Sequence, residues 1–474
     1  MKKTGKIHYL FKNMAIFTIG SFVSKLLVFF LVPFYTSILT ESEYGIADVM
    51  QSSLLLLVPL LSINAGEAAL RYGLEYTEDR DVIFLYGIKR VSFSIIPVII
   101  LSGALSLLFP DYRIYFLFFI VLYTADAFFE YMLLYCQGTE EVKKMIIGSV
   151  SSTFFVIVSN LFFLLVLRMG IYGYLFSQMI AFSLSAALMF VLTGGKEKIR
   201  SAVEKSSSDL NREMGVYGKS MLLYSTASWV NNAIDRYFIL FLLGSVQNGL
   251  YGVAYKIPAI LTTVQRIFAM AWQMSAVKEY KGDDREEFFS KMYRSYQTVL
   301  VTGCAVIILF LKIIATIMFR KDFFNAWILV PPLLISVVFG ALEGFLGSIA
   351  LAFKDGRSMG IATGVGAGFN IILNYIWIRD MGSFGAACAT FVSYFIMFAL
   401  AFIFVRRHVK LKVFILRDVI AYGLLIAESV LVIRNTGNFL YWNAGIVFIL
   451  ICLYLNEIRY IYIKGTEKIK RRAQ

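Results

Sequence analysis

The chain has 474 residues, of which 59% are hydrophobic and only 16% charged, and its net charge is +14. Its mean hydropathy of +0.73 is too high for a soluble protein of this length, which would need far more polar surface. The apolar segments are continuous runs of about twenty residues, the length of a membrane-spanning helix, without the alternation of barrel strands. The sequence therefore predicts an all-α integral membrane protein.

Taken in chain order, the apolar runs bounded by charged residues, glycine or proline predict about 14 transmembrane helices. The first six lie near 12–38, 46–65, 83–108, 113–135, 145–167 and 171–193. The next six lie near 217–243, 251–276, 292–319, 326–351, 358–378 and 384–405. A last pair lies near 415–433 and 439–463.

Lysine and arginine are concentrated in alternate loops, on the side that also holds the N-terminal lysines. The positive-inside rule then places both termini in the cytoplasm. Topology and contact with anionic lipid headgroups explain the basic excess, so it does not indicate a nucleic-acid partner. The loops of the opposite side are turns, too short to form a folded domain.

Cysteine and histidine give no sign of a metal site. The four cysteines have neither disulfide nor ligand spacing, and the two histidines lie beside basic loop residues. The acidic residues of the loops form no catalytic constellation either. We therefore expect neither a metal nor another cofactor.

Two short motifs recur in the same order in the two halves of the chain. Glu43–Asp48 is echoed by Leu250–Tyr255, and Met169–Gly173 by Met381–Gly385, about 210 residues later in each case. An even number of predicted helices separates the copies, so both halves insert with the same orientation. Parallel repeats of this kind are a transporter architecture.

The repeat divides the chain into four parts. Residues 1–195 are predicted to form an N-terminal six-helix lobe, 196–216 a polar cytoplasmic linker, 217–410 a C-terminal six-helix lobe, and 411–474 an extra helix pair with a basic tail. The predicted architecture is two parallel six-helix bundles around a central cavity, plus the C-terminal pair.

Four motifs are shared with a known family: Tyr44-Gly45, Gly66–Arg71, Asp235-Arg236 and Gly249–Ala254. Through them, most of residues 8–408 resembles the multidrug/oligosaccharidyl-lipid/polysaccharide exporter superfamily, and specifically its Wzx-type polysaccharide flippases. The Asp-Arg pair followed by the Gly-x-Tyr motif is the most specific part of this resemblance.

The resemblance implies a multi-pass inner-membrane protein that moves undecaprenyl-pyrophosphate-linked oligosaccharides to the outer leaflet by alternating access. It implies as partners the lipid-linked oligosaccharide, membrane lipids, and polysaccharide polymerase and assembly proteins. A flippase for the peptidoglycan lipid precursor and a drug or cation antiporter of the same superfamily stay open as alternatives. A membrane glycosyltransferase or polymerase is disfavoured because the outer loops are turns, so we do not expect an enzyme.

A pyrophosphate crosses hydrocarbon only where cationic groups replace its hydration, which predicts basic residues facing an aqueous cavity. The candidates are Lys25, Arg71, Arg236 and Arg266. For Lys25 and Arg266 the alternative is a buried ion pair. For Arg71 it is a structural i,i+4 pair with Glu67.

Consecutive residues do not share a helix face, so Asp235 and Arg236 are expected to contact different neighbours. Lys256 and Lys312 lie near predicted helix ends, where long basic side chains reach the headgroups readily. We favour this snorkelling for both lysines over a place in the cavity.

Acidic residues within the predicted helices are candidates for coupling transport to a proton or sodium gradient. Asp126 and Glu130 are four residues apart and share one helix face, where two carboxylates could hold a cation. The alternative is that each pairs with a base such as Lys25 or Arg266. Asp235 and Glu343 are further candidates for coupling.

Small residues and prolines predict details of packing. The glycines at 360, 364 and 368 repeat at four-residue spacing and are expected to let another helix approach closely. Pro258 and Pro331-Pro332 are expected to kink or break their helices.

Overall fold

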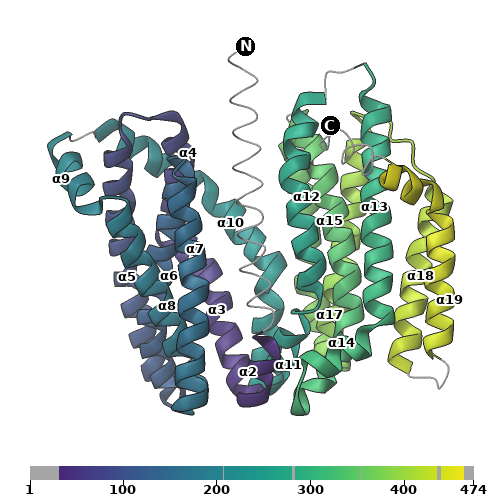
Figure 1. Cartoon of the computed structure of the whole chain (residues 1–474), viewed down its shortest axis with the longest axis horizontal. Coiled ribbons are helices and arrows are strands. Elements are labelled where there is room, and N and C mark those ends of the chain that lie inside the picture. Colours follow the sequence, from purple (N-terminus) through teal and green to yellow (C-terminus); the bar gives the residue numbers. More distant parts are fainter. Residues whose placement is uncertain (1–30, 206–207, 280–282, 354, 435–438, 464–474) are drawn as a thin grey trace. The chain divides into compact units, whose positions relative to one another are not determined.

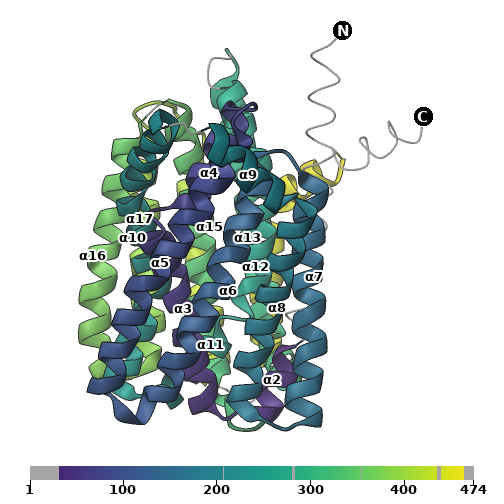
Figure 2. The same cartoon turned by 90° about the vertical axis from the view of Figure 1, so that its left-hand side faces the viewer.

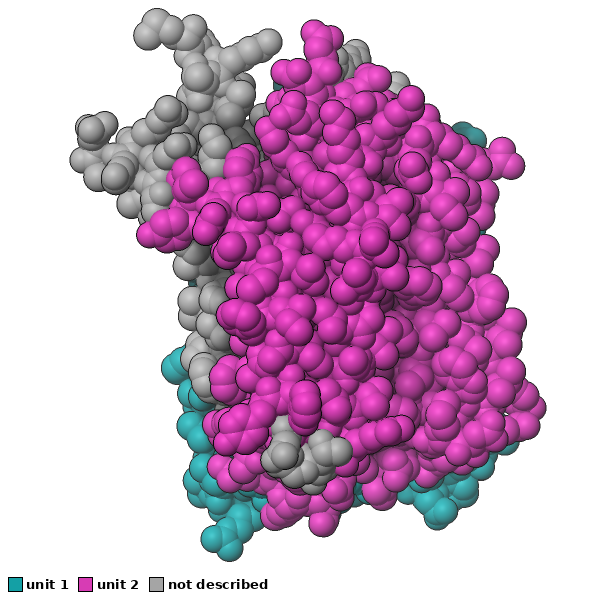
Figure 3. Space-filling view, turned by 90° about the vertical axis from the view of Figure 1, so that its right-hand side faces the viewer, with its two compact units in different colours: residues 1–233 teal, residues 234–474 magenta. Residues whose placement is uncertain are grey.

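The computed structural model describes residues 31–205, 208–279, 283–353, 355–434 and 439–463, and within them every regular element is a helix (Figure 1). The chain divides into two compact units, unit 1 (Met1–Ala233) and unit 2 (Ile234–Gln474), which Figure 3 colours separately. The all-α prediction is confirmed. Residues 196–216, expected to link the lobes, hold α9 and the first turns of α10.

Unit 1 is built of long helices that run side by side (Figures 1 and 2). In chain order its helices are α2 (Val32–Ile38), α3 (Glu41–Leu61), α4 (Ala65–Glu75), α5 (Arg80–Leu108), α6 (Arg113–Gly138), α7 (Val142–Asn160), α8 (Gly170–Leu192), α9 (Gly195–Lys205) and the first part of α10 (Ser208–Leu243). A short 3₁₀ turn, Pro110–Tyr112, precedes α6, and α7 continues as a π-helical segment, Leu161–Val166.

Unit 2 begins within α10 and has the same all-helical character. Its further helices are α11 (Ser245–Ala254), α12 (Pro258–Glu279), α13 (Arg285–Leu309), α14 (Leu311–Met318), the 3₁₀ segment η3 (Lys321–Leu329), α15 (Val330–Ala352), α16 (Gly356–Met381), α17 (Ser383–Val405), α18 (Ile415–Arg434) and α19 (Phe439–Leu453). A last described helix, Leu455–Ile463, is bent by 65° from α19.

By length and composition, nine of the described helices could each cross a membrane, or ten if α19 and the helix after it form one span. The predicted count of about 14 also includes less apolar helices such as α12 and α18. Most of the first predicted helix, 12–38, lies outside the described residues.

The structure interrupts four of the predicted helices. The one near 46–65 ends at Ser62–Asn64, and those near 251–276, 292–319 and 439–463 are broken at Tyr255–Ile257, at Phe310 and at Tyr454. Pro258, expected to break its helix, is confirmed as the first residue of α12.

The break between α3 and α4 is held by the first half of α10. Ile63 and Asn64 both have positive φ (58° and 50°), a conformation that is costly for side chains other than glycine. The Asn64 amide donates to the Gly218 carbonyl (3.3 Å) and accepts from the Ser225 hydroxyl (2.9 Å). A Cβ on Gly218 would overlap the Ile63 carbonyl oxygen, so only glycine permits this contact.

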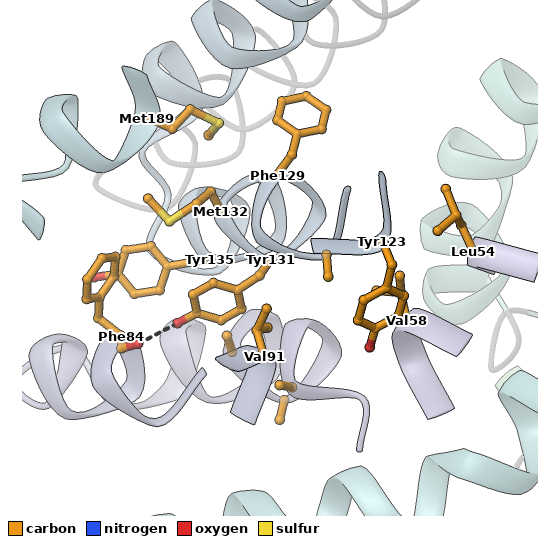
Figure 4. Close-up of a cluster of buried hydrophobic side chains, with 14 of the residues drawn as sticks. Leu54, Val58, Phe84, Val91, Tyr123, Phe129, Tyr131, Met132, Tyr135 and Met189 are labelled. Atoms are coloured by element: carbon orange, nitrogen blue, oxygen red, sulfur yellow. Dashed lines mark hydrogen bonds between the residues drawn. The ribbon is translucent and has the colours of Figure 1, made fainter. Parts of the chain in front are cut away.

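The core of unit 1 is a row of α6 tyrosines that bond to α5 (Figure 4). The Tyr131 hydroxyl donates to the Phe84 carbonyl (2.9 Å), and the Tyr123 hydroxyl donates to the Ser94 hydroxyl (2.8 Å). Gly87 makes room for the Tyr131 ring, which a Cβ at this position would overlap. The rings bury apolar area while their hydroxyls find partners, as membrane interiors require.

The second repeat motif has a glycine with positive φ in both units. These are Gly170, the first residue of α8 (54°), and Gly382, the residue before α17 (60°). Three residues on, Gly173 and Gly385 let that helix approach the chain before it. A Cβ on Gly173 would lie 3.0 Å from the Phe163 carbonyl oxygen, and a Cβ on Gly385 would overlap the Trp377 carbonyl oxygen.

The helix starts near the repeat motifs are also joined within each unit. In unit 1, the Glu43 carboxylate accepts from the backbone N–H of Ile171 (3.3 Å), which ties the start of α3 to the start of α8. In unit 2, the Ser383 hydroxyl donates to the side chain of Gln247 (3.0 Å), three residues before the repeated motif, which ties the start of α11 to the start of α17.

The loop that follows α17 returns to the turn between α15 and α16. His408 Nε2 lies 2.8 Å from Asp355 Oδ2, and the backbone N–H of Ser358 donates to Asp355 Oδ1 (3.2 Å). These hydrogen bonds lower the pKa of the Asp355 carboxyl to about 2. The carboxylate is therefore ionised at neutral pH and caps α16.

The prediction that another helix packs closely on the glycines at 360, 364 and 368 is wrong among the described residues. A Cβ on any of the three would meet no described atom within 4 Å, so this face of α16 is open there. The packed glycine is Gly366, where a Cβ would overlap Met397 Cγ of α17. Four-residue spacing marks a face of a helix but does not say which face meets a neighbour.

We predict that Gly385→Ala destabilises the protein by about 1–3 kcal/mol or more, because its Cβ would strike backbone that cannot rotate away. The matched control is Gly364→Ala in α16, where a Cβ meets no described atom, so the change should be neutral or slightly stabilising. Thermal unfolding of both variants in the same detergent measures the difference. Equal melting temperatures would contradict the close approach.

Candidate functional site

Asp235 of α10 is the most deeply buried charged residue among the described candidates, with 1% of its surface exposed. Its Oδ2 accepts from the Tyr251 hydroxyl (2.7 Å) and from the Thr390 hydroxyl (2.5 Å). Its Oδ1 accepts from the Asn374 side-chain amide (2.6 Å). Three neutral donors thus surround this carboxylate.

The donors come from three other helices, so the Asp235 carboxylate joins α10, α11, α16 and α17. Asn374 also donates to Asn370 Oδ1 (3.0 Å), one turn earlier in α16, and its own Oδ1 has no partner among the described residues. The three donors satisfy the Asp235 carboxylate in its ionised form, in place of water.

Arg236 follows Asp235 but points elsewhere. Its guanidinium lies 4.8 Å from the centre of the Tyr255 ring, a cation–π contact. The prediction that the two consecutive charges contact different neighbours is confirmed. The Asp235 carboxylate is held by hydroxyl and amide groups, whereas the Arg236 guanidinium lies against an aromatic face.

Glu343 lies near the same group of residues. It is half-buried on α15, and Tyr394 of α17 is within electrostatic range of Glu343, Tyr255 and Asp235. A Cβ on Gly340 would lie 3.0 Å from the Tyr394 ring, which places the two helices in close contact at this level. The structure therefore brings three predicted residues of unit 2, Asp235, Arg236 and Glu343, around two tyrosines.

The acidic pair of unit 1 gains a third member. Both residues lie on α6, where Asp126 is half-buried and Glu130 is exposed. Glu130 interacts electrostatically with Asp126 and also with Glu67 of α4. The helices are in contact, since a Cβ on Gly138 would lie 2.6 Å from the Ala69 carbonyl oxygen. Three carboxylates at one place repel one another unless a proton or cation is bound.

The alternative of an ion pair between Glu67 and Arg71 is not found in the structure. Arg71 instead pairs with Glu75 one turn further along α4, at 3.6 Å, with most of both side chains exposed. Glu67 is turned toward α6 because α4 packs on α6 through Ala68 and Ala69, which are fully buried. An exposed pair of this kind adds little stability.

The other basic candidates are spread over unit 2. Arg266 is exposed on α12, and Lys256 lies in the break between α11 and α12. The Lys312 ammonium lies 4.9 Å from the Trp327 ring and 4.4 Å from the Phe439 ring. Lys25 lies outside the described residues.

Sequence reasoning missed the neutral partners of Asp235. Tyr251 stands out in the sequence only as part of the repeated Tyr-Gly motif. Asn374 and Thr390 follow Asp235 by about 140–155 residues, and no motif around either residue marks it as a partner. It also missed Glu67 as the third carboxylate beside Asp126 and Glu130, because α4 is brought there by the unpredicted break in the second helix.

Residues 10–277, more than half of the chain, match the family described as polysaccharide biosynthesis protein. The chain belongs to this family. A curated member of similar sequence is the probable low-salt glycan biosynthesis flippase Agl15 of Haloferax volcanii, 23% identical over 241 residues. That match spans 50% of this chain and about half (51%) of the relative's length.

Two solved structures show the same fold as this member of the family. The lipid II flippase MurJ in an inward closed conformation has a TM-score of 0.66 and 15% identity, over 95% of this chain and 100% of that one. An inward-facing multidrug resistance MATE transporter of the MOP superfamily has a TM-score of 0.66 and 12% identity, over 82% of this chain and 97% of that one. The resemblance is thus confirmed for the polysaccharide biosynthesis family and for the fold, and the named relatives are flippases and transporters, not enzymes.

We predict that Tyr251→Phe destabilises the protein by about 1–3 kcal/mol, because it removes one donor from the buried Asp235 carboxylate. The same change at Tyr441, which is 80% exposed on α19, is the matched control and should be neutral. Denaturant unfolding of the purified variants checks this. If both variants unfold like the parent, the donor does not support the carboxylate.

Proposed function

We propose that this protein is a flippase that moves lipid-linked oligosaccharides from the cytoplasmic to the outer leaflet of the inner membrane for surface polysaccharide biosynthesis. Membership of the polysaccharide biosynthesis family and the MOP-superfamily fold support the reaction class. Undecaprenyl pyrophosphate is the carrier that the family resemblance implies. A polysaccharide polymerase and assembly proteins would receive the product.

The observation that carries the proposal is the different surroundings of Asp235 and Arg236. The carboxylate is held by three neutral donors, while the guanidinium lies over the Tyr255 ring. An arginine so placed can bind a pyrophosphate through charge-assisted hydrogen bonds. Arg266, exposed on α12, would offer a second positive charge to a pyrophosphate. Lys25 and Arg71 complete the proposed set of basic substrate-binding residues.

Transport would proceed by alternating access, with both termini in the cytoplasm. The parallel repeat supports this, since in each unit a side-chain hydrogen bond ties the start of one helix to the start of a later one near the repeated motifs. The distribution of lysine and arginine among the loops supports the orientation.

We further propose that a proton or sodium ion bound at Asp235 couples transport to the ion gradient. Binding there would change contacts among four helices at once, because each donor to the carboxylate comes from a different helix. Asp126 and Glu130 in unit 1 and Glu343 in unit 2 are the other candidate ion sites.

Arg236→Ala and Lys25→Ala are each expected to abolish surface polysaccharide in a host whose own copy of the gene is deleted, because the anionic head loses its counter-charge. The measurement is surface polysaccharide at matched protein abundance. Arg200→Ala is the control and should leave display unchanged, since the Arg200 side chain is 87% exposed on α9 and pairs with Glu204 of the same helix.

Normal polysaccharide from both variants would overturn the cationic site. The deletion host itself separates the alternatives. Loss of surface polysaccharide with intact growth supports the proposal, whereas lysis from failed wall synthesis would assign the peptidoglycan lipid precursor as substrate. Drug sensitivity with normal polysaccharide would assign an antiporter.

Asp235→Asn is expected to remove the response of transport to an imposed gradient, because the amide cannot bind and release the coupling ion. In proteoliposomes, the parent should be accelerated about tenfold or more by a proton or sodium gradient, and the variant not at all. Asp111→Asn, at an exposed position before α6, is the control. A variant that still responds to the gradient would exclude Asp235 as the coupling group.

A further inference from the structure

Three tyrosine rings form a column at the end of α4 in unit 1. The Tyr72 and Tyr76 rings are stacked, with centres 5.7 Å apart and an angle of 18° between their planes. The Tyr217 ring of α10 meets the Tyr72 ring edge-on, with centres 5.9 Å apart. All three residues are half-buried, so the column borders the surface of unit 1.

The column differs from the buried tyrosine row of α6 in having an open end. The α6 tyrosines are almost completely buried and bond to α5. Stacking covers one face of the Tyr76 ring, and among the described residues no second ring contacts Tyr76. The other face of this half-buried ring has no aromatic neighbour there, and we call it the free face of Tyr76.

Charged side chains lie close to the column. The Tyr76 hydroxyl donates to the Glu213 carboxylate of α10 (3.5 Å). Glu213, Glu75 and Arg71 are all within electrostatic range of Tyr72. Arg71 and Glu75 are the exposed pair of α4 described above. Two carboxylates and one guanidinium therefore lie near a free aromatic face.

Another tyrosine cluster of unit 1 has the surroundings of an aromatic group that faces lipid. Tyr115 of α6 and Tyr172 of α8 are stacked, with centres 6.1 Å apart. The exposed residues next to Tyr115 in the chain include Ile114 and Leu117, which are apolar. This composition is typical of the aromatic belt at a membrane surface.

The exposed neighbours of Tyr76 are polar instead. Thr77 and Glu78 follow it in the chain and are both exposed. Leu74 is exposed as well, but it lies two residues after Tyr72, and residues at that spacing do not share a helix face. The column therefore ends at a polar surface, where an aromatic belt does not account for it.

An aromatic face beside carboxylate and guanidinium groups has the chemistry of a sugar-binding site. The C–H groups on one face of a pyranose carry partial positive charge and pack on the negative face of an aromatic ring. The sugar hydroxyls donate to carboxylates and accept from a guanidinium. Small-molecule sites generally combine aromatic surface with a few polar groups in this way.

We propose that the free face of Tyr76 stacks on a sugar ring of the lipid-linked oligosaccharide, with Glu213 and Glu75 accepting from the sugar hydroxyls. This inference rests on the proposed flippase function and adds recognition of the sugar to that of the pyrophosphate. Tyr72 and Tyr217 hold the Tyr76 ring in place before the substrate binds, which lowers the cost of ordering it.

The place of the column suits a substrate that enters from the cytoplasm. Figures 1 and 2 show α4 at the same end of unit 1 as α9, which lies in the predicted cytoplasmic linker. Arg71, one of the proposed basic residues, lies one turn before Glu75 on α4. In a pyrophosphate-linked oligosaccharide the first sugar is bonded to the pyrophosphate, so a cation and an aromatic face on one helix match the order of the two groups.

An organic cation is the other class of ligand that binds aromatic rings beside carboxylates. Arg71 disfavours it, because the guanidinium within electrostatic range of Tyr72 would repel a like charge. A sugar carries no such charge and uses the guanidinium as a donor.

The test measures the binding of two lipids to the full-length protein in detergent. One is the pyrophosphate-linked oligosaccharide extracted from the deletion host, and the other is undecaprenyl pyrophosphate without sugar. Tyr76→Leu should weaken binding of the first about tenfold, because stacking is lost, and should leave binding of the second unchanged. Tyr76→Phe keeps the ring and should retain most of the affinity for the first lipid.

Tyr441→Leu, at the exposed position on α19, is the matched control and should change neither affinity. A Tyr76→Leu variant that binds both lipids like the parent would overturn the sugar contact and leave the flippase function standing. Equal weakening of both lipids would overturn it too, since the role of Tyr76 would then be structural.

Two further outcomes separate this inference from the function on which it rests. A parent that binds neither lipid would overturn the proposed function and the sugar contact together. Binding of tetraphenylphosphonium that Tyr76→Leu abolishes, while both lipids bind as before, would replace the sugar by an organic cation.

Discussion

The unit 2 fold depends on the burial of one carboxylate. Asp235 is placed where water does not reach it, and Tyr251, Asn374 and Thr390 replace the water with neutral donors. In a low-dielectric interior such bonds are strong and their absence is costly, so the four helices involved must stay in register. The same arrangement leaves Arg236 beside Tyr255, which is what gives the site a positive charge.

Breaks in the helices are the second structural device. The left-handed residues at Ile63 and Asn64 turn the second predicted helix so that Glu67 reaches the acidic pair on α6. The first half of α10 holds this turn through hydrogen bonds to Asn64. In unit 2 a break before Pro258 separates α11 from α12. Strained backbone of this kind persists where surrounding contacts over-determine it.

Errors in the sequence-based predictions have a common physical cause. Hydropathy and spacing report which residues can share a helix face, but they do not say which neighbour that face meets. The 360/364/368 stripe therefore has the spacing of a packing surface although Gly366 is the packed glycine. In the same way, the spacing of Glu67 and Arg71 allows an ion pair although Arg71 pairs with Glu75.

The sequence by itself determined the all-helical membrane class, the internal repeat and the family, because apolar run length and the Tyr-Gly and Met-Gly motifs are local properties of the chain. It also singled out Asp235 and Arg236 as charges pointing to different neighbours. Only the tertiary structure decided what those neighbours are. The partners of Asp235 come from helices far along the chain, and a hydrogen bond between distant residues leaves no pattern in the sequence around either of them.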